Sequence, residues 1–235
     1  MNAPVFIMSP LYRSGSTALQ RVFNAHPGVT IWGETRWPGY FWHGLKWNSI
    51  GDGTRARFES GERNLWTAVM CPERSKLVKG AAEFLMATHV TTGVWGIKMV
   101  RSGIEVVQLL DEMFPDARYV FLARDPIDTI TSLLSSRWNL EEYERDVEWL
   151  AFTWRNRVRD FNEYAAHNPT RAYFLDYVRM SDMRKLEEAF AVTGIPFQPS
   201  LAANALAERI GESVKEPLSE DQVRRINEII PPVGF

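Results

Sequence analysis

The sequence predicts an α/β fold in which helices flank a mainly parallel central sheet. The first observation behind this prediction is that short apolar runs, typical of strands buried on both faces, alternate with segments of helical periodicity. The second is that two of these apolar runs end in loops rich in residue types that bind anions. The 235 residues contain no internal repeat, low-complexity tract or convincing linker, so we expect a single domain over residues 1–235.

The individual elements follow from the spacing of apolar residues along the chain. Strands are expected where apolar residues are continuous, at 5–8, 29–32, 94–100, 119–122 and 172–175. Helices are expected where apolar residues recur every three or four positions, from Ser16 to about His26 and at 73–90, 104–114, 127–137 and 141–166, with another after Asp176-Tyr177. The last helix is expected to begin at Ser219, because Gln222 completes a capping box. Residues 50–64 are rich in glycine, arginine and polar residues and predict a loop.

Composition narrows the classes of function. The net charge of −2 creates no overall field that would attract nucleic acid or an anionic membrane, so we expect neither as a partner. Cys71 is the single cysteine, which excludes an internal disulfide and a metal cluster of cysteines, and no metal is expected. The N-terminus lacks the pattern of a signal peptide and no 18 consecutive residues are apolar, which predicts a cytoplasmic protein.

Residues 10–17, which we call the anion loop, have the pattern of an anion-binding turn. Gly15 forms the turn after a buried strand, and Ser16 and Thr17 open a helix, so backbone N–H groups and the positive end of the helix dipole meet at one point. Arg13 adds a permanently charged, planar donor. The loop is not a Walker A motif, because no lysine follows a glycine before the Ser/Thr pair. A serine near a helix start is also a common N-cap, so a purely structural role stays open.

The second informative segment is residues 119–126 with the helix that follows. Arg124 stands at the carboxyl end of a predicted strand, where open α/β sheets bind their ligands, and Ser132 lies about two helical turns further on. This pair could hold a phosphate from two directions. An Arg124-Asp125 pair on the surface is the structural alternative.

Together the two segments resemble the sulfotransferase family that uses 3′-phosphoadenosine-5′-phosphosulfate (PAPS). Residues 13–17 match the family's loop for the 5′-phosphosulfate, and Arg124 with Ser132 matches its 3′-phosphate site. The resemblance reaches residue 197 and implies a fold of the P-loop nucleotide-binding type, PAPS as donor and adenosine-3′,5′-bisphosphate as product. The cofactor-binding residues that it implies are Arg13, Ser14, Gly15, Ser16, Thr17, Arg124, Ser132 and, as a weaker candidate, Tyr177. The loop arginine and Ala25-His26-Pro27 are more similar to the tyrosylprotein and carbohydrate branch than to the classical cytosolic branch.

The resemblance also implies two catalytic residues, Glu34 and Lys98. The classical histidine two positions after the strand lysine is replaced by Val100, whereas residues 32–36 resemble the segment whose glutamate is the base in tyrosylprotein sulfotransferases. Glu34 could instead be a surface carboxylate paired with Arg36. Lys98 stands in an apolar strand, so it should reach a site or find a carboxylate, unless it extends to solvent. By analogy with the family, it would stabilise negative charge at the transferred group.

The remaining candidates are less specific. The histidines are conceivable bases without a supporting motif, with a capping role more natural for the first of them; they are His26, His43, His89 and His167. Lys215 is a further candidate to reach the nucleotide, from a C-terminal loop. Four tryptophans at 32, 37, 42 and 47 fit either a packed cluster beneath a loop or an aromatic wall around an acceptor.

The acceptor is expected to be a small molecule with a hydroxyl group. The branch resemblance keeps protein tyrosine and sugar hydroxyls open. An ATP-dependent phosphotransferase is a further alternative, disfavoured by the missing Gly-Lys step, and a non-catalytic nucleotide-binding or scaffold protein is another. The sequence does not indicate an oligomeric state.

Overall fold

The computed structural model of the protein describes residues 3–34, 37, 41, 74–136, 145–208 and 216–231. The predicted loop at 50–64 lies outside these residues. So do several side chains that the sequence singles out, namely Arg36, Trp42, His43, Trp47, Cys71 and Lys215.

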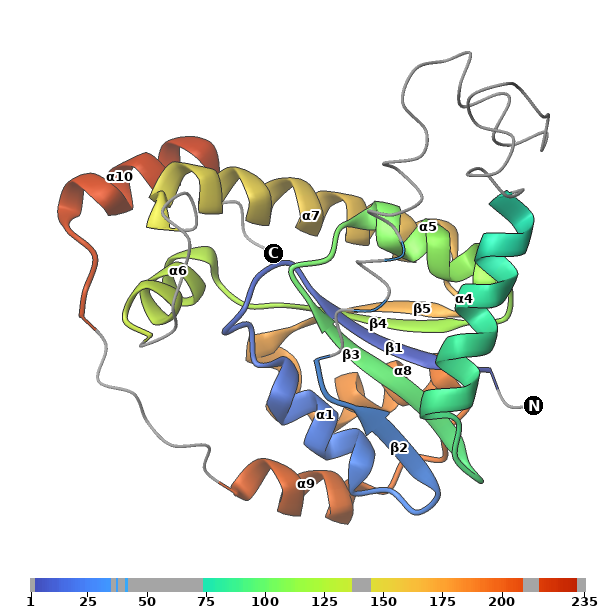
Figure 1. Cartoon of the computed structure of the whole chain (residues 1–235). Helices are drawn as coiled ribbons and strands as arrows, with labels where there is room; N and C mark the ends of the chain where they lie inside the picture. The colour runs from blue at the N-terminus through green and yellow to red at the C-terminus, as the bar shows by residue number, and fades with distance from the viewer. Residues whose placement is uncertain are drawn as a thin grey trace, which may run out of the picture.

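A five-stranded parallel sheet forms the centre of the molecule, as predicted. In chain order its strands are β1 (Val5–Ser9), β2 (Val29–Trp32), β3 (Val94–Val100), β4 (Arg118–Ala123) and β5 (Ala172–Asp176). In space the order is β2-β3-β1-β4-β5, and every neighbouring pair is parallel. Because all five strands run the same way, their carboxyl ends meet at one edge of the sheet, at the left in Figure 1.

Helices cover both faces of the sheet (Figure 1). The helices are α1 (Ser16–Asn24), α4 (Arg74–His89), α5 (Ile104–Met113), α6 (Pro126–Leu134), α7 (Val147–His167), α8 (Met183–Thr193), α9 (Pro199–Ala207) and α10 (Glu220–Ile229), with a 3-10 turn η2 (Tyr177–Ser181) after β5. One core cluster joins the sheet to α4, α5 and α7, and a second joins it to α1, α8 and α9. The α/β class is therefore confirmed.

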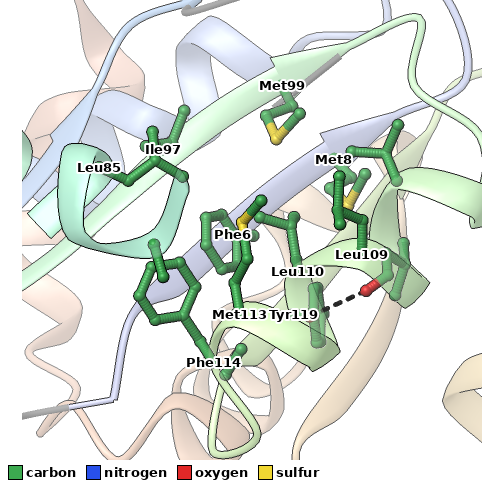
Figure 2. Packing of buried hydrophobic residues seen from close by; sticks show 14 of the residues in the cluster. Phe6, Met8, Leu85, Ile97, Met99, Leu109, Leu110, Met113, Phe114 and Tyr119 are labelled. Atoms are coloured by element: carbon green, nitrogen blue, oxygen red, sulfur yellow. Dashed lines mark hydrogen bonds between the residues drawn. The ribbon is translucent and has the colours of Figure 1, made fainter. Parts of the chain in front are cut away.

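The larger core shows why the apolar runs form strands. Phe6 and Met8 of β1 and Ile97 of β3 are fully buried, and they pack against Leu109 and Leu110 of α5 (Figure 2). Alternate residues of the same strands fill the core on the other face of the sheet. Strands covered by helices on both faces need apolar side chains at nearly every position, which explains why continuous runs marked them correctly.

Two predicted helix boundaries are wrong. The helix expected at 141–166 begins only at Val147, because the Asp146 side chain accepts hydrogen bonds from the N–H groups of Glu148 and Trp149 and caps it. The helix expected at 127–137 is α6, which begins one residue earlier and ends at Leu134. Proline at its first position fits an N-terminus, where an N–H group is not needed.

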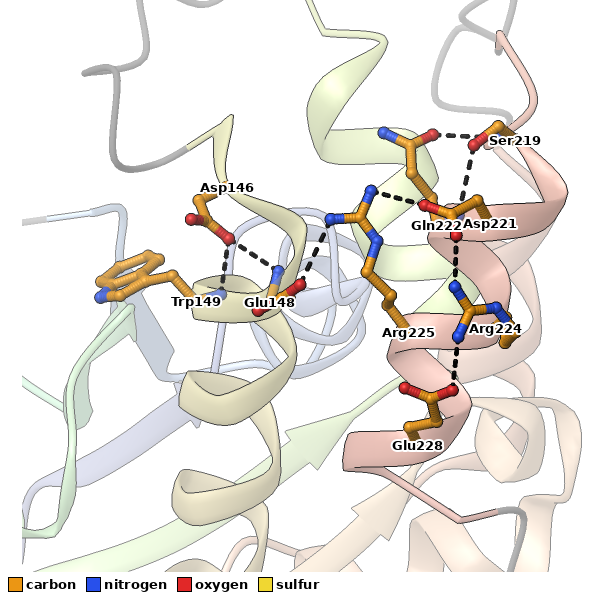
Figure 3. A network of polar contacts seen from close by, with 9 residues as sticks. All are labelled: Asp146, Glu148, Trp149, Ser219, Asp221, Gln222, Arg224, Arg225 and Glu228. Atoms are coloured by element: carbon orange, nitrogen blue, oxygen red, sulfur yellow. Dashed lines mark hydrogen bonds and ion pairs between the residues drawn. The ribbon is translucent and has the colours of Figure 1, made fainter.

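The C-terminal helix α10 is held against the start of α7 (Figure 3). Ser219 and Gln222 form the predicted capping box. Arg225 bridges the two helices, because its guanidinium lies 3.2 Å from Glu148 of α7 and 2.7 Å from Asp221 of α10. This contact links α10 to the start of α7.

A polar network closes the opposite, amino edge of the sheet. Asp111 of α5 accepts hydrogen bonds from the hydroxyls of Tyr119 (2.9 Å) and Tyr164 (2.7 Å), and Arg171 binds both of its carboxylate oxygens. We call these four residues the Asp111 cluster. It connects α5, β4, α7 and the turn before β5, so its role is to hold the layers together.

Candidate functional site

The anion loop connects β1 to α1 at the carboxyl edge, with β1 in the middle of the sheet. Gly15 is the N-cap of α1 and has a φ of 88°, a left-handed conformation that favours glycine. Among the described residues, no side chain caps this helix, so its first N–H groups point to the space enclosed by the loop. Because the N-cap is a glycine, the alternative that a loop serine is merely the N-cap is wrong.

Buried hydroxyls set the shape of the loop. Ser14 is fully buried and donates its hydroxyl to the carbonyl of Leu11 at 2.8 Å, and Ser9 donates to the same carbonyl at 3.2 Å. Arg13 has a φ of 67°, which turns its side chain out of the loop toward α6. These contacts fix the path of the loop to the start of α1, and Arg13 links the loop to α6.

Three predicted residues from distant parts of the sequence meet beside the loop, and we call them the Lys98 cluster. The ammonium of Lys98 on β3 lies 3.0 Å from the hydroxyl of Thr17 and 3.0 Å from Oε1 of Glu34, just after β2. The Lys98 side chain is only 5% exposed, whereas that of Glu34 is 40% exposed. The prediction that Lys98 finds a carboxylate is confirmed, and the alternative that it extends to solvent is wrong.

Helix α1 sets the position of Glu34. The Asn24 side chain accepts a hydrogen bond from the backbone N–H of Ile31 (2.6 Å) and donates one to its carbonyl (3.0 Å). Gln20 donates to the same carbonyl at 2.8 Å. These contacts fix β2 against α1, so the glutamate that follows β2 keeps its place relative to the loop that precedes α1.

The second predicted motif joins the loop from the other side. Arg13 donates from Nε to the hydroxyl of Ser132 at 3.1 Å, and Ser132 is buried on α6. Arg124 binds Asp128 at 2.8 Å, but its Nε is buried and has no hydrogen-bond partner among the described residues. A buried, unpaired guanidinium N–H is costly, so this donor is suited to a ligand oxygen.

Tyr177 lies between the two motifs. The Arg124 guanidinium stacks 5.0 Å from the centre of the Tyr177 ring. The same ring covers Gly15 so closely that an added Cβ there would come within 2.3 Å of its carbon atoms. A cavity of about 680 Å³ adjoins this pair, and its other lining residues include Trp154, Phe174, Asp176 and Lys185. This volume lies within the range of small-molecule pockets.

The described histidines have other surroundings. His26 is buried, with Nδ1 2.8 Å from the carbonyl of Val22 and Nε2 accepting the N–H of Gln198 at 3.0 Å. Both of its ring nitrogens are therefore used within the fold, in agreement with a capping role. Burial lowers the pKa of His89, whose Nδ1 faces the Leu85 carbonyl. His167 contacts the Glu163 carbonyl at the end of α7.

Sequence reasoning did not single out three supporting residues of the site. Asn24 and Gln20, which position the strand before Glu34, occupy ordinary polar helix positions. Asp128, the partner of Arg124, has a weak signal in the sequence, because the two opposite charges are four positions apart.

Two further observations concern ligands and membranes. Within the part of the chain that the structure describes, no helix is long and apolar enough to cross a membrane. The same part of the chain shows no group of three or more His, Cys, Asp or Glu side chains arranged to hold a metal ion.

Comparisons with known proteins concern the family and the fold. A family model described as "Sulfotransferase family" matches residues 4–199. No curated protein sequence matches the chain significantly. Among solved structures, the sulfotransferase domain of the Synechococcus PCC 7002 olefin synthase is similar with a TM-score of 0.56 and 15% identity, covering 100% of this chain and 98% of that one.

Two other solved structures have the same fold. Sulfotransferase STF9 from Mycobacterium avium is similar with a TM-score of 0.57 and 13% identity over 97% of this chain and 75% of its own. Mouse sulfotransferase SULT7A1, solved with PAP (adenosine-3′,5′-bisphosphate), gives a TM-score of 0.51 and 14% identity over 87% of this chain and 62% of its own.

Proposed function

Since the chain belongs to the sulfotransferase family, we propose that it transfers a sulfuryl group from PAPS to a hydroxyl of a small-molecule acceptor. The observation that carries this proposal is the Lys98 cluster. It places one cation, Lys98, 3.0 Å from a carboxylate and 3.0 Å from a hydroxyl of the anion loop.

The residues around the anion loop fit the donor. The start of α1, which has no side-chain cap among the described residues, and Arg13 suit a phosphosulfate, and the unpaired Nε of Arg124 with the hydroxyl of Ser132 suits a phosphate. The aromatic ring of Tyr177 and the cavity beside it suit an adenosine group. When bound, PAPS would supply the sulfuryl group and leave as adenosine-3′,5′-bisphosphate.

Glu34 is proposed as the general base. Its partly exposed carboxylate can receive the proton of an acceptor hydroxyl, so that the oxygen can attack sulfur while the bond to the nucleotide's bridging oxygen breaks. Lys98 is proposed to stabilise the negative charge that develops on that departing oxygen. Because Lys98 already binds Glu34 and Thr17, its positive charge is held in place before the substrate arrives.

An aromatic cluster supports a small acceptor with apolar parts. Trp37 lies three residues after Glu34, and its ring contacts Phe84 of α4 at 5.1 Å and Phe41 at 6.3 Å between centroids. Trp37 is 46% exposed and Phe84 is 37% exposed, so both rings offer surface to a ligand. Protein tyrosine and sugar hydroxyls are alternative acceptors. The cytoplasmic location stays a prediction from sequence.

A pair of variants tests the assignment of roles. Glu34→Ala is expected to keep its affinity for adenosine-3′,5′-bisphosphate and to lose about 10²- to 10⁴-fold in turnover. Arg124→Ala is expected to lose nucleotide affinity. Nucleotide binding is measured by thermal shift and calorimetry, and turnover by mass detection of sulfated products in an acceptor screen. Two variants on the exposed face of α7 are the controls. Glu163→Ala removes a negative charge, as Glu34→Ala does, and Arg159→Ala removes a positive charge, as Arg124→Ala does.

The outcomes separate the parts of the proposal. Full activity of Glu34→Ala with saturating acceptor would show that another group is the base. Stabilisation by ATP with Mg²⁺, but not by adenosine-3′,5′-bisphosphate, would favour the phosphotransferase alternative.

A further inference from the structure

One aromatic ring contacts both of the segments that are proposed to bind the phosphate groups of the donor. Tyr177 is the first residue of η2, directly after β5. Its ring lies against Gly15 of the anion loop, where two ring carbons would be 2.3 Å from an added Cβ. The guanidinium carbon of Arg124, just after β4, lies 5.0 Å from the centre of the same ring. The anion loop and the segment after β4 are therefore joined through this side chain.

The fold fixes the place of the Tyr177 ring. Asp176 caps η2, because its side chain accepts the N–H of Val178 at 3.1 Å. Leu175 and Met180, on either side of Tyr177 in the chain, are buried in the core that joins the sheet to α1 and α8, and Tyr177 packs against that core. Because the chain is anchored before and after it, the ring has a defined position between the two segments.

The ring also completes the surroundings of Arg124. The backbone carbonyl of Arg124 accepts hydrogen bonds from Nε1 of Trp154 at 3.1 Å and from the hydroxyl of Thr129 at 3.3 Å. At the other end of the residue, Nη2 donates to Asp128 at 2.8 Å. Stacking on Tyr177 restricts the remaining rotation of the guanidinium plane. A guanidinium held in this way presents its donors in one direction.

These contacts belong to the ring of Tyr177 and not to its hydroxyl. Among the described residues, the hydroxyl makes no hydrogen bond, whereas ring atoms contact both Gly15 and Arg124. Phenylalanine could therefore take the place of Tyr177 in both contacts. An aliphatic residue could not, because it has no aromatic face for the guanidinium.

We propose that Tyr177 is a positioning residue that acts through Arg124 and sets the spacing between the two phosphate-binding segments. This spacing makes the protein selective for a nucleotide with phosphate groups at the 3′ and 5′ positions over the 2′,5′ isomer. Two anionic groups of one ligand can both reach their cations without further reorganisation only if the cations are already held at the matching distance. The inference rests on the proposed sulfuryl transfer from PAPS and adds the residue that determines which donor isomer is bound.

The test compares two ligands of equal charge, adenosine-3′,5′-bisphosphate and adenosine-2′,5′-bisphosphate. Their dissociation constants with the 235-residue chain are measured by calorimetry, which needs no turnover. We expect the wild type to bind the 3′,5′ isomer about tenfold or more tightly than the 2′,5′ isomer. Tyr177→Leu should lower this preference by about 3- to 10-fold, the effect of losing a partly desolvated cation–π contact. Tyr177→Phe should retain the preference.

Further variants separate positioning from a general structural effect. Tyr173→Leu removes another tyrosine ring from the same cavity, one whose hydroxyl binds Glu188 at 2.6 Å, and should leave the preference unchanged. Arg124→Lys keeps the charge without the planar guanidinium and should lower the preference by itself. In the Arg124→Lys background, Tyr177→Leu should have no additional effect, because the ring acts through the guanidinium. Thermal melting reports whether each variant folds, and Tyr177→Met replaces Tyr177→Leu if the latter does not.

Specific results would overturn the inference. Equal affinities of the wild type for the two isomers would do so, as would an unchanged preference in Tyr177→Leu. An equal loss of affinity for both isomers would assign the ring to the nucleoside alone, and a loss of preference in Tyr177→Phe would assign the role to the hydroxyl. Failure of the proposed function is recognised separately, because the wild type would then bind neither isomer, whereas the results above all require that it binds at least one.

Discussion

The two edges of the central sheet carry polar clusters of opposite character. At the amino edge, both oxygens of Asp111 are bound, by two tyrosine hydroxyls and by Arg171. At the carboxyl edge, Glu34 is 40% exposed and the Nε of Arg124 is buried without a partner among the described residues. The Asp111 cluster is satisfied within the protein, whereas Glu34 and Arg124 have hydrogen-bonding capacity left for a ligand.

This difference suggests that the two edges contribute to different properties of the protein, stability and activity. A fully paired network rigidifies the layers that it connects. Removing one member leaves the other polar groups without hydrogen-bond partners, which lowers the free energy of unfolding. An incompletely paired cluster contributes less to stability but can bind a substrate without first breaking many contacts. We therefore expect stability to depend mainly on the amino edge and activity on the carboxyl edge.

The largest expected effect is at the carboxyl edge. Lys98→Met should reduce turnover with PAPS by about 10²- to 10³-fold, because the preorganised cation is lost. The free energy of unfolding should change by less than about 1 kcal/mol, because methionine suits a buried strand and the partly exposed Glu34 can be solvated. Steady-state kinetics and urea denaturation measure the two quantities. Lys79→Met, at an exposed position of α4, is the control.

The next effect should appear at the amino edge without affecting chemistry. Asp111→Ala removes the shared acceptor of three side chains and should lower the free energy of unfolding by about 2–3 kcal/mol. The turnover of the folded fraction should stay close to that of the wild type. Asp116→Ala, in the exposed turn that follows α5, should change stability by less than about 0.5 kcal/mol. If Asp111→Ala instead abolished turnover in the folded enzyme, the division between the two edges would be wrong.

The smallest effect is a pH dependence that belongs to the amino edge. Burial, together with the charge of Asp111, raises the pKa of Tyr119 well above its ordinary value of about 10. Tyr119 in the folded protein therefore keeps its proton at alkaline pH, where the unfolded chain loses it. Its contribution is fully present below about pH 10 and is lost as pH rises above that value, by up to about 1.4 kcal/mol per pH unit.

Denaturation midpoints between pH 9 and 11 test this dependence. Tyr119→Phe should be less stable at pH 9 and should lose stability less steeply with rising pH than the wild type. An unchanged slope would show that Tyr119 is not the group responsible.

The sequence predicted the strands well and the helix boundaries less well, for physical reasons. A strand buried on both faces requires a continuous apolar run, and few other secondary structures require such a run within a short segment. The stretch before α7 contains acidic residues that are common both inside helices and at their N-termini, so Asp146 could not be recognised as the cap. Helix α9 was missed, because its short, alanine-rich segment after Pro199 shows little periodicity.

For the site, sequence patterns indicated residues but not their contacts. The anion loop and Arg124 are local motifs, so they could be identified from spacing. The contacts of Lys98 with Glu34 and of Arg13 with Ser132 join residues 64 and 119 positions apart, and only the strand order brings them together.

The hydrogen bonds from α1 to Ile31 also protect the protein against association. Among the described strands, β2 lies at an edge of the sheet, and an edge strand with free backbone groups can pair with a strand of another molecule. Here the side chains of Asn24 and Gln20 occupy both the N–H and the carbonyl of Ile31, so that helix side chains take the place of a sixth strand. The same two amides that align the proposed base with the anion loop therefore also make this edge a poor template for intermolecular β-pairing.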